Sequence, residues 1–372
     1  MRLLSGSRGA APAIAVLLIM AACTTSGSAP KVNAAAAKSV ADVGGMNGLI
    51  AAAKAEGTLN TIGLPSDWAN FGAIMSGFTS KYGIQVNSEN PIAFGQEEVD
   101  AVGKLGSSSQ APDVLDLGMK VALANTNLFA PYEVATWGDI VLAQKDPGGL
   151  WYQDYGGHIS IGYDSSKVPP ITDVSDLLGT KFHGTIALTG DPSKADPTKA
   201  DAALNGVLMA SLANGGSLDD VSKGVDFFHQ LKVKGNLAPV PATSATVKSG
   251  TTAVVLEWDY LSQSHISDVP TWKIFVPPTA TLGLYYAQAI NKHAPHPAAA
   301  RLWEEYLYSD EGQNLFLKGG KRPVRESAMK AKGTLDFAAS KDLPAVTGNS
   351  VFATPDQLAA AATYLASHWA KV

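Results

Sequence analysis

The first 120 residues alternate between helical and extended patterns, and this alternation restricts the possible folds more than any other feature. Apolar residues recur at helical spacing in three stretches, and short apolar runs of strand length lie between them. The expected helices are residues 47–56, 71–82 and 97–107, and the expected strands are residues 58–63, 84–86 and 114–117. A strand–helix–strand–helix–strand order predicts an α/β fold with a parallel sheet.

The second half of the chain repeats this alternation. Expected strands are residues 185–188, 253–256 and 273–278, and expected helices are residues 204–213, 221–231, 297–308 and 310–317. About 325 residues follow position 45, which is more than one hydrophobic core usually serves. The sequence therefore predicts two lobes.

The N-terminus carries an export signal that ends at the only cysteine of the chain. Arg2 and Arg8 precede an apolar run at residues 11–22, which is too short to span a membrane and is typical of a secretory signal peptide. Residues 19–23 resemble a bacterial lipobox, with cleavage before Cys23 and lipid on its sulfur. The alternative is an ordinary signal peptide that contains a cysteine.

Export has consequences for the rest of the chain. A single cysteine cannot form a disulfide within the chain, so the fold must form outside the cytoplasm without one. We expect a cell-envelope protein, lipid-anchored to the membrane through Cys23. Removing residues 1–22 changes the formal charge from 28 − 33 = −5 to 26 − 33 = −7, which disfavours nucleic acid as a partner.

Four stretches of the sequence resemble one family. Residues 49–57 look like its usual mature start, and residues 78–86 look like its helix-to-strand step. Residues 176–192 contain a "DL" and a "DP" segment, and residues 294–313 resemble an "hPnAA…LSpEGQ" signature. In this order they resemble the extracellular solute-binding proteins of ABC transporters, in the group that includes polyamine, ferric-ion, thiamine and phosphonate binders.

The resemblance implies a two-lobed periplasmic-binding-protein-like fold of type II. Each lobe would be a mixed, mainly parallel sheet flanked by helices, and the ligand would lie in the cleft between the lobes. We expect residues 1–22 as signal peptide, 23–45 as flexible tether, 46–160 as the first part of lobe 1, 161–270 as lobe 2, and 271–372 as the return to lobe 1 plus C-terminal helices. The implied partners are a small solute and a membrane permease, and we expect a monomer without cofactor or bound metal.

Several candidate ligand-binding residues lie beside expected strand ends. Asp67 and Trp68 follow the first strand, and the alternative role for this segment is a helix N-cap. Trp151 and Tyr152 belong to an aromatic cluster that suits ammonium groups, or that packs the lobe interface. Asp191 follows residues 185–188 and would contact a ligand amine or cap the next helix.

The strongest local signal is Glu257, Trp258 and Asp259, directly after a buried strand, where solvent is expected to return. In polyamine-binding relatives, an aromatic residue and a carboxylate at this loop hold the amine. The alternative is a capped loop with Trp258 in the core. Tyr285, beside a second tyrosine, is a candidate contact for an organic ligand or for ferric ion.

The sequence favours a binding protein over an enzyme, because the hydrolase, metalloprotease and P-loop motifs are absent from it. Carboxylates beside aromatic rings favour a polyamine-like cation as the solute. A phosphonate held on helix N-termini is the first alternative. The small number of arginines near the expected cleft weakens this alternative without removing it. Thiamine or ferric ion, a secreted hydrolase and a surface adhesion protein are further alternatives.

Overall fold

The computed structural model describes residues 33–341 and 343–372. The predicted signal peptide and lipidation site at Cys23 therefore lie outside the described residues. Of the predicted tether, residues 23–45, the structure describes residues 33–45, and these pack on the domain. Ala34, Ala37 and Val43 are buried there, and Arg301 donates hydrogen bonds to the carbonyls of Ala35 and Ala37.

The first lobe contains the strands and helices that come early in the chain, together with a group from the C-terminal third. Its early elements are α1 (Gly45–Glu56), β1 (Thr58–Ile62), α2 (Phe71–Tyr82), β2 (Gln85–Glu89), α3 (Gln96–Leu105), β3 (Val114–Leu117), α4 (Met119–Ala124) and β4 (Phe129–Ala130). Its later elements are α9 (Pro297–Leu307), α10 (Asp310–Lys318), β10 (Arg322–Pro323), α11 (Glu326–Lys332) and α12 (Phe337–Ser340).

The second lobe contains the middle of the chain and the last helix. Its elements are β6 (Ile186–Leu188), α5 (Ala202–Ala213), α6 (Ser222–Val233), α7 (Ser244–Ser249), β7 (Val254–Trp258), α8 (Asp259–Ser264), β8 (Trp272–Phe275) and α13 (Pro355–His368). Leu358, Ala361 and Leu365 of α13 are buried in the core of this lobe. Residues 271–372 therefore divide between the two cores.

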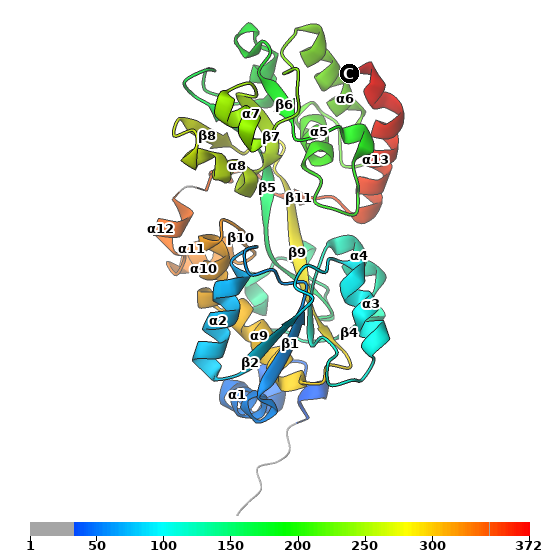
Figure 1. Ribbon diagram of the computed structural model, residues 1–372, viewed down its shortest axis with the longest axis vertical. Coiled ribbons are helices and arrows are strands. Elements are labelled where there is room, and N and C mark those ends of the chain that lie inside the picture. Colours follow the sequence, from blue (N-terminus) through cyan, green and yellow to red (C-terminus); the bar gives the residue numbers. More distant parts are fainter. Residues whose placement is uncertain (1–32, 342) are drawn as a thin grey trace, which may run out of the picture. The chain divides into compact units, whose positions relative to one another are not determined.

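Two long strands, β5 (Tyr152–Asp164) and β9 (Leu282–Asn291), connect the lobes (Figure 1). The sheet order is β2-β1-β3-β9-β5-β7-β6. β1 pairs in parallel with β2 and β3 in the first lobe, and β6 pairs in parallel with β7 in the second. β9 and β5 run antiparallel to their neighbours at the centre. The predicted two-lobed α/β fold is confirmed.

The helix boundaries follow from local chemistry. Phe71, Ile74 and Phe78 are buried on the expected face of α2, and the helix ends at Gly83, whose φ of 72° favours glycine. α1 begins at Gly45, two residues before the expected start at residue 47. Across the described part of the chain, every helix is too short or too polar to cross a bilayer.

Glu304 is a buried acid on α9 with an unusual environment. The residue is 0 % exposed, and neither carboxyl oxygen has a hydrogen-bond partner within the described residues. Burial, which disfavours the charged form, raises the pKa of Glu304 well above its ordinary value of 4.5. The folded chain therefore binds this proton more tightly than the unfolded chain does.

This difference predicts a pH dependence. The free energy of unfolding should fall as pH rises above 4.5, the ordinary pKa, because the folded state holds more protons than the unfolded state. Glu304→Gln, which cannot ionise, should make this decline shallower than in the wild type. Urea unfolding between about pH 4.5 and pH 8 measures the slope. Glu89→Gln, at an exposed position on β2, should leave it unchanged, and an unchanged slope in Glu304→Gln would contradict the prediction.

Candidate functional site

A pocket with a volume of about 180 Å³ lies where both lobes meet the connecting strands. The first lobe contributes residues 118–120 at the carboxyl end of β3, and the second lobe contributes residues 197–200 from the segment that follows β6. Residues 283–286 of β9 form its floor. Carboxyl ends of strands are a common place for ligands in such sheets, as the sequence led us to expect.

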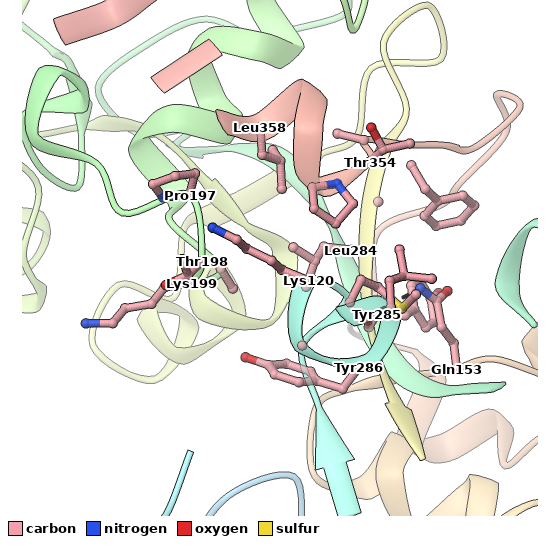
Figure 2. A pocket seen from close by; sticks show the side chains of 18 of the residues that line it. Lys120, Gln153, Pro197, Thr198, Lys199, Leu284, Tyr285, Tyr286, Thr354 and Leu358 are labelled. Atoms are coloured by element: carbon pink, nitrogen blue, oxygen red, sulfur yellow. Dashed lines mark hydrogen bonds between the residues drawn. The ribbon is translucent and has the colours of Figure 1, made fainter. Parts of the chain in front are cut away.

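Among the described residues, lysines are the only charged ones that line this pocket. Lys120, at the start of α4, forms no ion pair within residues 33–341 and 343–372, and its ammonium group extends toward Pro197 (Figure 2). Lys199 is already 3.6 Å from the carboxylate of Asp196, and its ammonium points away from the other labelled side chains. Lys120 therefore supplies an uncompensated positive charge at the pocket.

The remaining lining is largely apolar. The first lobe contributes Phe94, Met119, Leu123 and Trp151, β9 contributes Leu284, Tyr285 and Tyr286, and the C-terminal segment contributes Phe352 and Leu358. Figure 2 shows Leu358 above Leu284, with Tyr285 and Tyr286 below it on β9. Tyr285 is 5 % exposed and Tyr286 is 9 % exposed, and burial raises the pKa of both phenols. Both tyrosines therefore present neutral rings.

A second group of aromatic rings encloses a lysine of the chain itself. Lys321 Nζ lies 3.9 Å from the ring centroid of Trp68 in the first lobe and 3.8 Å from that of Tyr260 in the second. Burial lowers the pKa of Lys321 to about 8, so the group is still mainly an ammonium ion at neutral pH. Such a cation–π arrangement contributes about 0.5–2 kcal/mol and links the lobes. The place between these rings is therefore occupied by an internal cation.

Trp68 is held in this arrangement by a short chain of hydrogen bonds. Its indole N–H donates to the Tyr155 hydroxyl at 2.9 Å, and that hydroxyl donates to Asp116 Oδ2 at 2.9 Å. Asp116 is thereby committed to Tyr155, and burial raises the pKa of its carboxyl. The carboxyl group of Asp116 thus has a structural role, as the acceptor that holds Tyr155.

The three residues at the end of β7 are all in the interior. Glu257, Trp258 and Asp259 are 3 %, 1 % and 0 % exposed, so the expectation that solvent returns there is wrong. The reason is that β7 continues directly into α8, which packs the segment against β5 and β10. Each of the three side chains lies next to a polar group of the chain itself.

Both carboxylates lie next to a basic side chain of the chain itself. His265 Nε2 lies 3.1 Å from Glu257 Oε1, and Arg322 Nε donates to Asp259 Oδ2. The indole N–H of Trp258 donates to the carbonyl of Ala200 at 2.9 Å. Asp259 and Arg322 thus form a buried ion pair between the second lobe and β10. Arg322 also donates hydrogen bonds to the carboxylate of Glu326.

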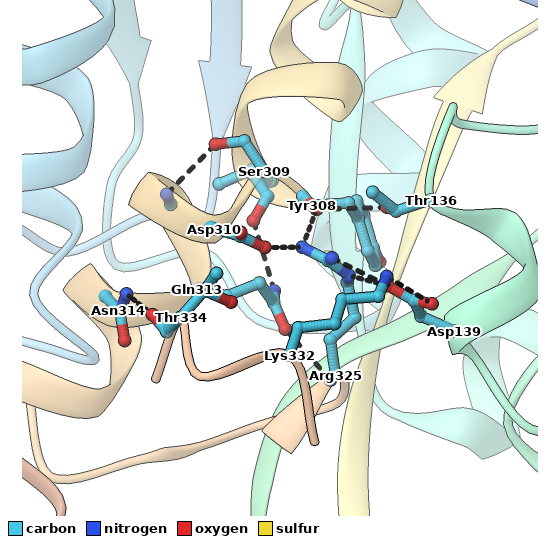
Figure 3. Close-up of polar contacts among 12 residues, drawn as sticks. Thr136, Asp139, Tyr308, Ser309, Asp310, Gln313, Asn314, Arg325, Lys332 and Thr334 are labelled. Carbon is cyan, nitrogen blue, oxygen red and sulfur yellow. Dashed lines mark hydrogen bonds and ion pairs between the residues drawn. The ribbon is translucent and has the colours of Figure 1, made fainter. Parts of the chain in front are cut away.

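The turn that carries Lys321 and Arg322 is fixed by a polar network around Arg325 (Figure 3). The Arg325 guanidinium donates to Asp139 Oδ2 at 2.7 and 3.0 Å and to the Tyr308 carbonyl at 2.7 Å. Asp310 lies 2.8 Å away on the other side. This network holds β10 against the first lobe, and so it sets the positions of Lys321 and Arg322 next to the second.

The other predicted ligand-binding residues are divided between the pocket, the core and the surface. Trp151 and Tyr285 line the pocket. Tyr152 is 1 % exposed and packs against Tyr308 at 4.8 Å. Asp191 is exposed and accepts a hydrogen bond from the Ser193 N–H at 3.0 Å, as an N-cap does.

Asp67 is exposed, and neither it nor Ser66 caps the helix that follows. The N-cap of α2 is Asn70.

Three residues at the site were missed by the sequence reasoning. Lys120 and Lys321 had no signal, because a lone lysine near a strand end is usually a solvated surface residue. Arg322 lies outside any recognised motif, and its burial depends on a contact with Asp259, 63 positions away.

The comparisons with known proteins establish the family. The sequence profile described as "Bacterial extracellular solute-binding protein" matches residues 107–345. The chain belongs to this family, which consists of solute-binding transport proteins of the ABC-transporter type and is not an enzyme family. Its members act outside the cytoplasm. No curated protein sequence matches the chain.

Solved structures confirm the fold at low sequence identity. An iron- and citrate-bound FutA from Trichodesmium has 19 % identity and a TM-score of 0.59, over 85 % of this chain and 98 % of its own. Iron-bound HitA from Pseudomonas aeruginosa has 20 % identity and a TM-score of 0.56, over 83 % and 98 %. The spermidine/putrescine-binding protein PotD from Streptococcus pneumoniae has 15 % identity and a TM-score of 0.61, over 83 % and 97 %.

The buried pair predicts a stability effect at the end of β7. Asp259→Asn removes the buried one of the two carboxylates that contact the Arg322 guanidinium and leaves only Glu326, so it should reduce the free energy of unfolding by about 3 kcal/mol. Asp191→Asn keeps an N-cap oxygen at an exposed position and should change it by less than about 0.5 kcal/mol. Urea denaturation of both variants measures the difference. Equal stability of Asp259→Asn and the wild type would show that the pair is not a structural contact.

Proposed function

We propose that the chain is the solute receptor of an ABC importer and that its solute is a small organic anion. The observation that carries this proposal is the charge of the pocket, because its lining includes Lys120 and Lys199 and no Asp or Glu. A carboxylate, phosphate or phosphonate group would find a charge-assisted partner at Lys120, which has no ion pair of its own in the described chain. The apolar remainder of the lining would contact the rest of the solute.

Carboxylates elsewhere at the lobe interface support the same proposal. Asp259 is paired with Arg322, Glu257 contacts His265, and Asp116 accepts from Tyr155. A polyamine would have to compete with these internal cations and donors. An incoming ammonium group would find no Asp or Glu in the described pocket lining to serve as its counter-charge.

A polyamine-like cation is the second candidate, since one observation favours it. The rings of Trp68 and Tyr260 already hold an ammonium group, that of Lys321. A solute amine could take that place only if Lys321 moved out. A phosphonate would also fit the anionic proposal. Ferric ion and thiamine are cations, and the described pocket lining offers them no carboxylate.

Capture would follow the usual mechanism of two-lobed receptors. The lobes are joined by β5 and β9, so rotation about these strands would open and close the pocket. Closure over the solute would create the surface that the permease recognises. The protein would be anchored to the membrane through lipid on Cys23, act as a monomer, and require no cofactor.

Lys120→Gln tests the anionic proposal. A thermal-shift panel of carboxylates, phosphonates, polyamines, thiamine and ferric salts first identifies a responder, because a ligand at about 100 times its Kd adds about 2.7 kcal/mol of stability. Calorimetry should then show about tenfold weaker binding of that anion to Lys120→Gln, equivalent to about 1.4 kcal/mol.

Lys194→Gln is the matched control, because Lys194 is exposed and pairs with Asp191 outside the pocket. Its affinity for the anion should equal that of the wild type. A panel in which only polyamines, thiamine or ferric salts respond would contradict the anionic proposal.

The lipid anchor is tested separately. Cys23→Ser removes the sulfur that would carry the lipid, so the full chain should move from the membrane fraction to the soluble extracytoplasmic fraction. Fractionation with immunodetection measures the change. A variant that stays with the membrane as the wild type does would refute lipidation at Cys23.

A further inference from the structure

The C-terminal residues 346–358, here called the strap, form one wall of the pocket. The match to the family profile ends at residue 345, so the strap follows the matched residues. Phe352, Thr354 and Leu358 of the strap nevertheless line the pocket. A segment outside the family match therefore contributes directly to the surface that a solute would contact.

The strap is held in place at three points. β11 (Val351–Phe352) pairs in parallel with β9, aligning Val351 with Leu282 and Phe352 with Gly283. Ser350 Oγ lies 2.8 Å from His158 Nε2 on β5. The strap ends in the first turn of α13, and this helix packs Leu358 and Leu365 into the core of the second lobe. The strap is thus attached to both connecting strands and to one lobe.

Phe352 is positioned closely over the pocket floor. A Cβ atom added at Gly283 would lie 2.7 Å from Phe352 Cε1, so the ring needs a glycine beneath it. Its centroid lies 5.9 Å from that of Tyr285, at an interplanar angle of 77°. The two rings meet edge to face, which limits how far an apolar group can extend along β9.

The size of the pocket defines what fits beside these rings. Its volume is about 180 Å³, and an engineered apolar cavity of about 150 Å³ is large enough to bind benzene. With Lys120 as the available cation, the lining matches a solute with one anionic group and one compact apolar group. Larger apolar groups would collide with Phe352.

Resting on the proposed function, we propose that the strap is the specificity wall of this receptor, and that it selects organic anions whose apolar part is about the size of one aromatic ring. Phe352 sets the upper limit of size, and Tyr285 and Leu358 provide the apolar contacts. Lys120 binds the anionic group. Solute selectivity is thereby assigned to a segment that follows the match to the family profile.

The test uses acetate, benzoate and 2-naphthoate as probes, measured by calorimetry on the wild type and on three variants. The wild type should bind benzoate at least about tenfold more tightly than acetate and 2-naphthoate. Phe352→Ala should shift the preference toward 2-naphthoate by about tenfold relative to benzoate, and Phe352→Leu should give an intermediate result. Val351→Ala, an exposed position on the same short strand, should keep the wild-type preference.

The outcomes separate the strap from the proposed function. If the wild type binds benzoate but Phe352→Ala keeps the same order of affinities, the strap is not the specificity wall, while the anionic receptor stands. If the wild type binds none of the three carboxylates, the solute class assigned to the strap is overturned, and the thermal-shift panel with phosphonates decides the proposed function separately. Circular dichroism of each variant establishes that a changed order does not come from unfolding.

Discussion

The structure depends on the burial of β5, the strand that belongs to both lobes. All thirteen of its residues, Tyr152–Asp164, are buried. Its first half pairs with β9 and β10, and its second half pairs with β7 and β8. A strand that is hydrogen-bonded on both sides cannot move independently of either lobe, so relative motion must occur by bending along β5 and β9. The register shift between Gln153 and Gly156 lies within this region.

Glycines in β5 allow the close contacts on which the lobe interface is built. A Cβ atom at Gly157 would lie 2.4 Å from Asp259 Oδ1, and one at Gly156 would lie 2.1 Å from the Leu284 carbonyl oxygen. Asp259 can therefore reach Arg322 across the strand, and the acids at the interface are committed to internal partners. The positive charge of the pocket comes from Lys120 and Lys199, because the described lining contains no Asp or Glu.

The sequence predicted the fold well because the fold is encoded locally. Helical spacing over α2 and the glycine at position 83 define that helix without any knowledge of its neighbours. In the same way, short runs of strand length in the sequence predict β1, β3 and β7. The site was harder to predict, because it depends on which side chains meet across long sequence separations. Glu257 and Asp259 have the chemistry of a cation site, and only their contacts with His265 and Arg322 reveal their structural use.

Tyr285 and Trp151, which the sequence suggested as ligand contacts because they are aromatic residues near the connecting strands, line the pocket. Phe352 was not found, since its role comes from the pairing of a two-residue strand with β9, and such a strand leaves no periodic pattern.

The central claim is that the pocket between β3, β9 and the strap binds an organic anion. Native mass spectrometry of the chain from residue 33 onward, in an equimolar mixture of benzoate, a phosphonate, spermidine, thiamine and ferric nitrate, tests it most directly. The account predicts one added mass per chain, equal to that of benzoate or of the phosphonate. Retention of spermidine, thiamine or iron, or of no solute at all, would contradict it.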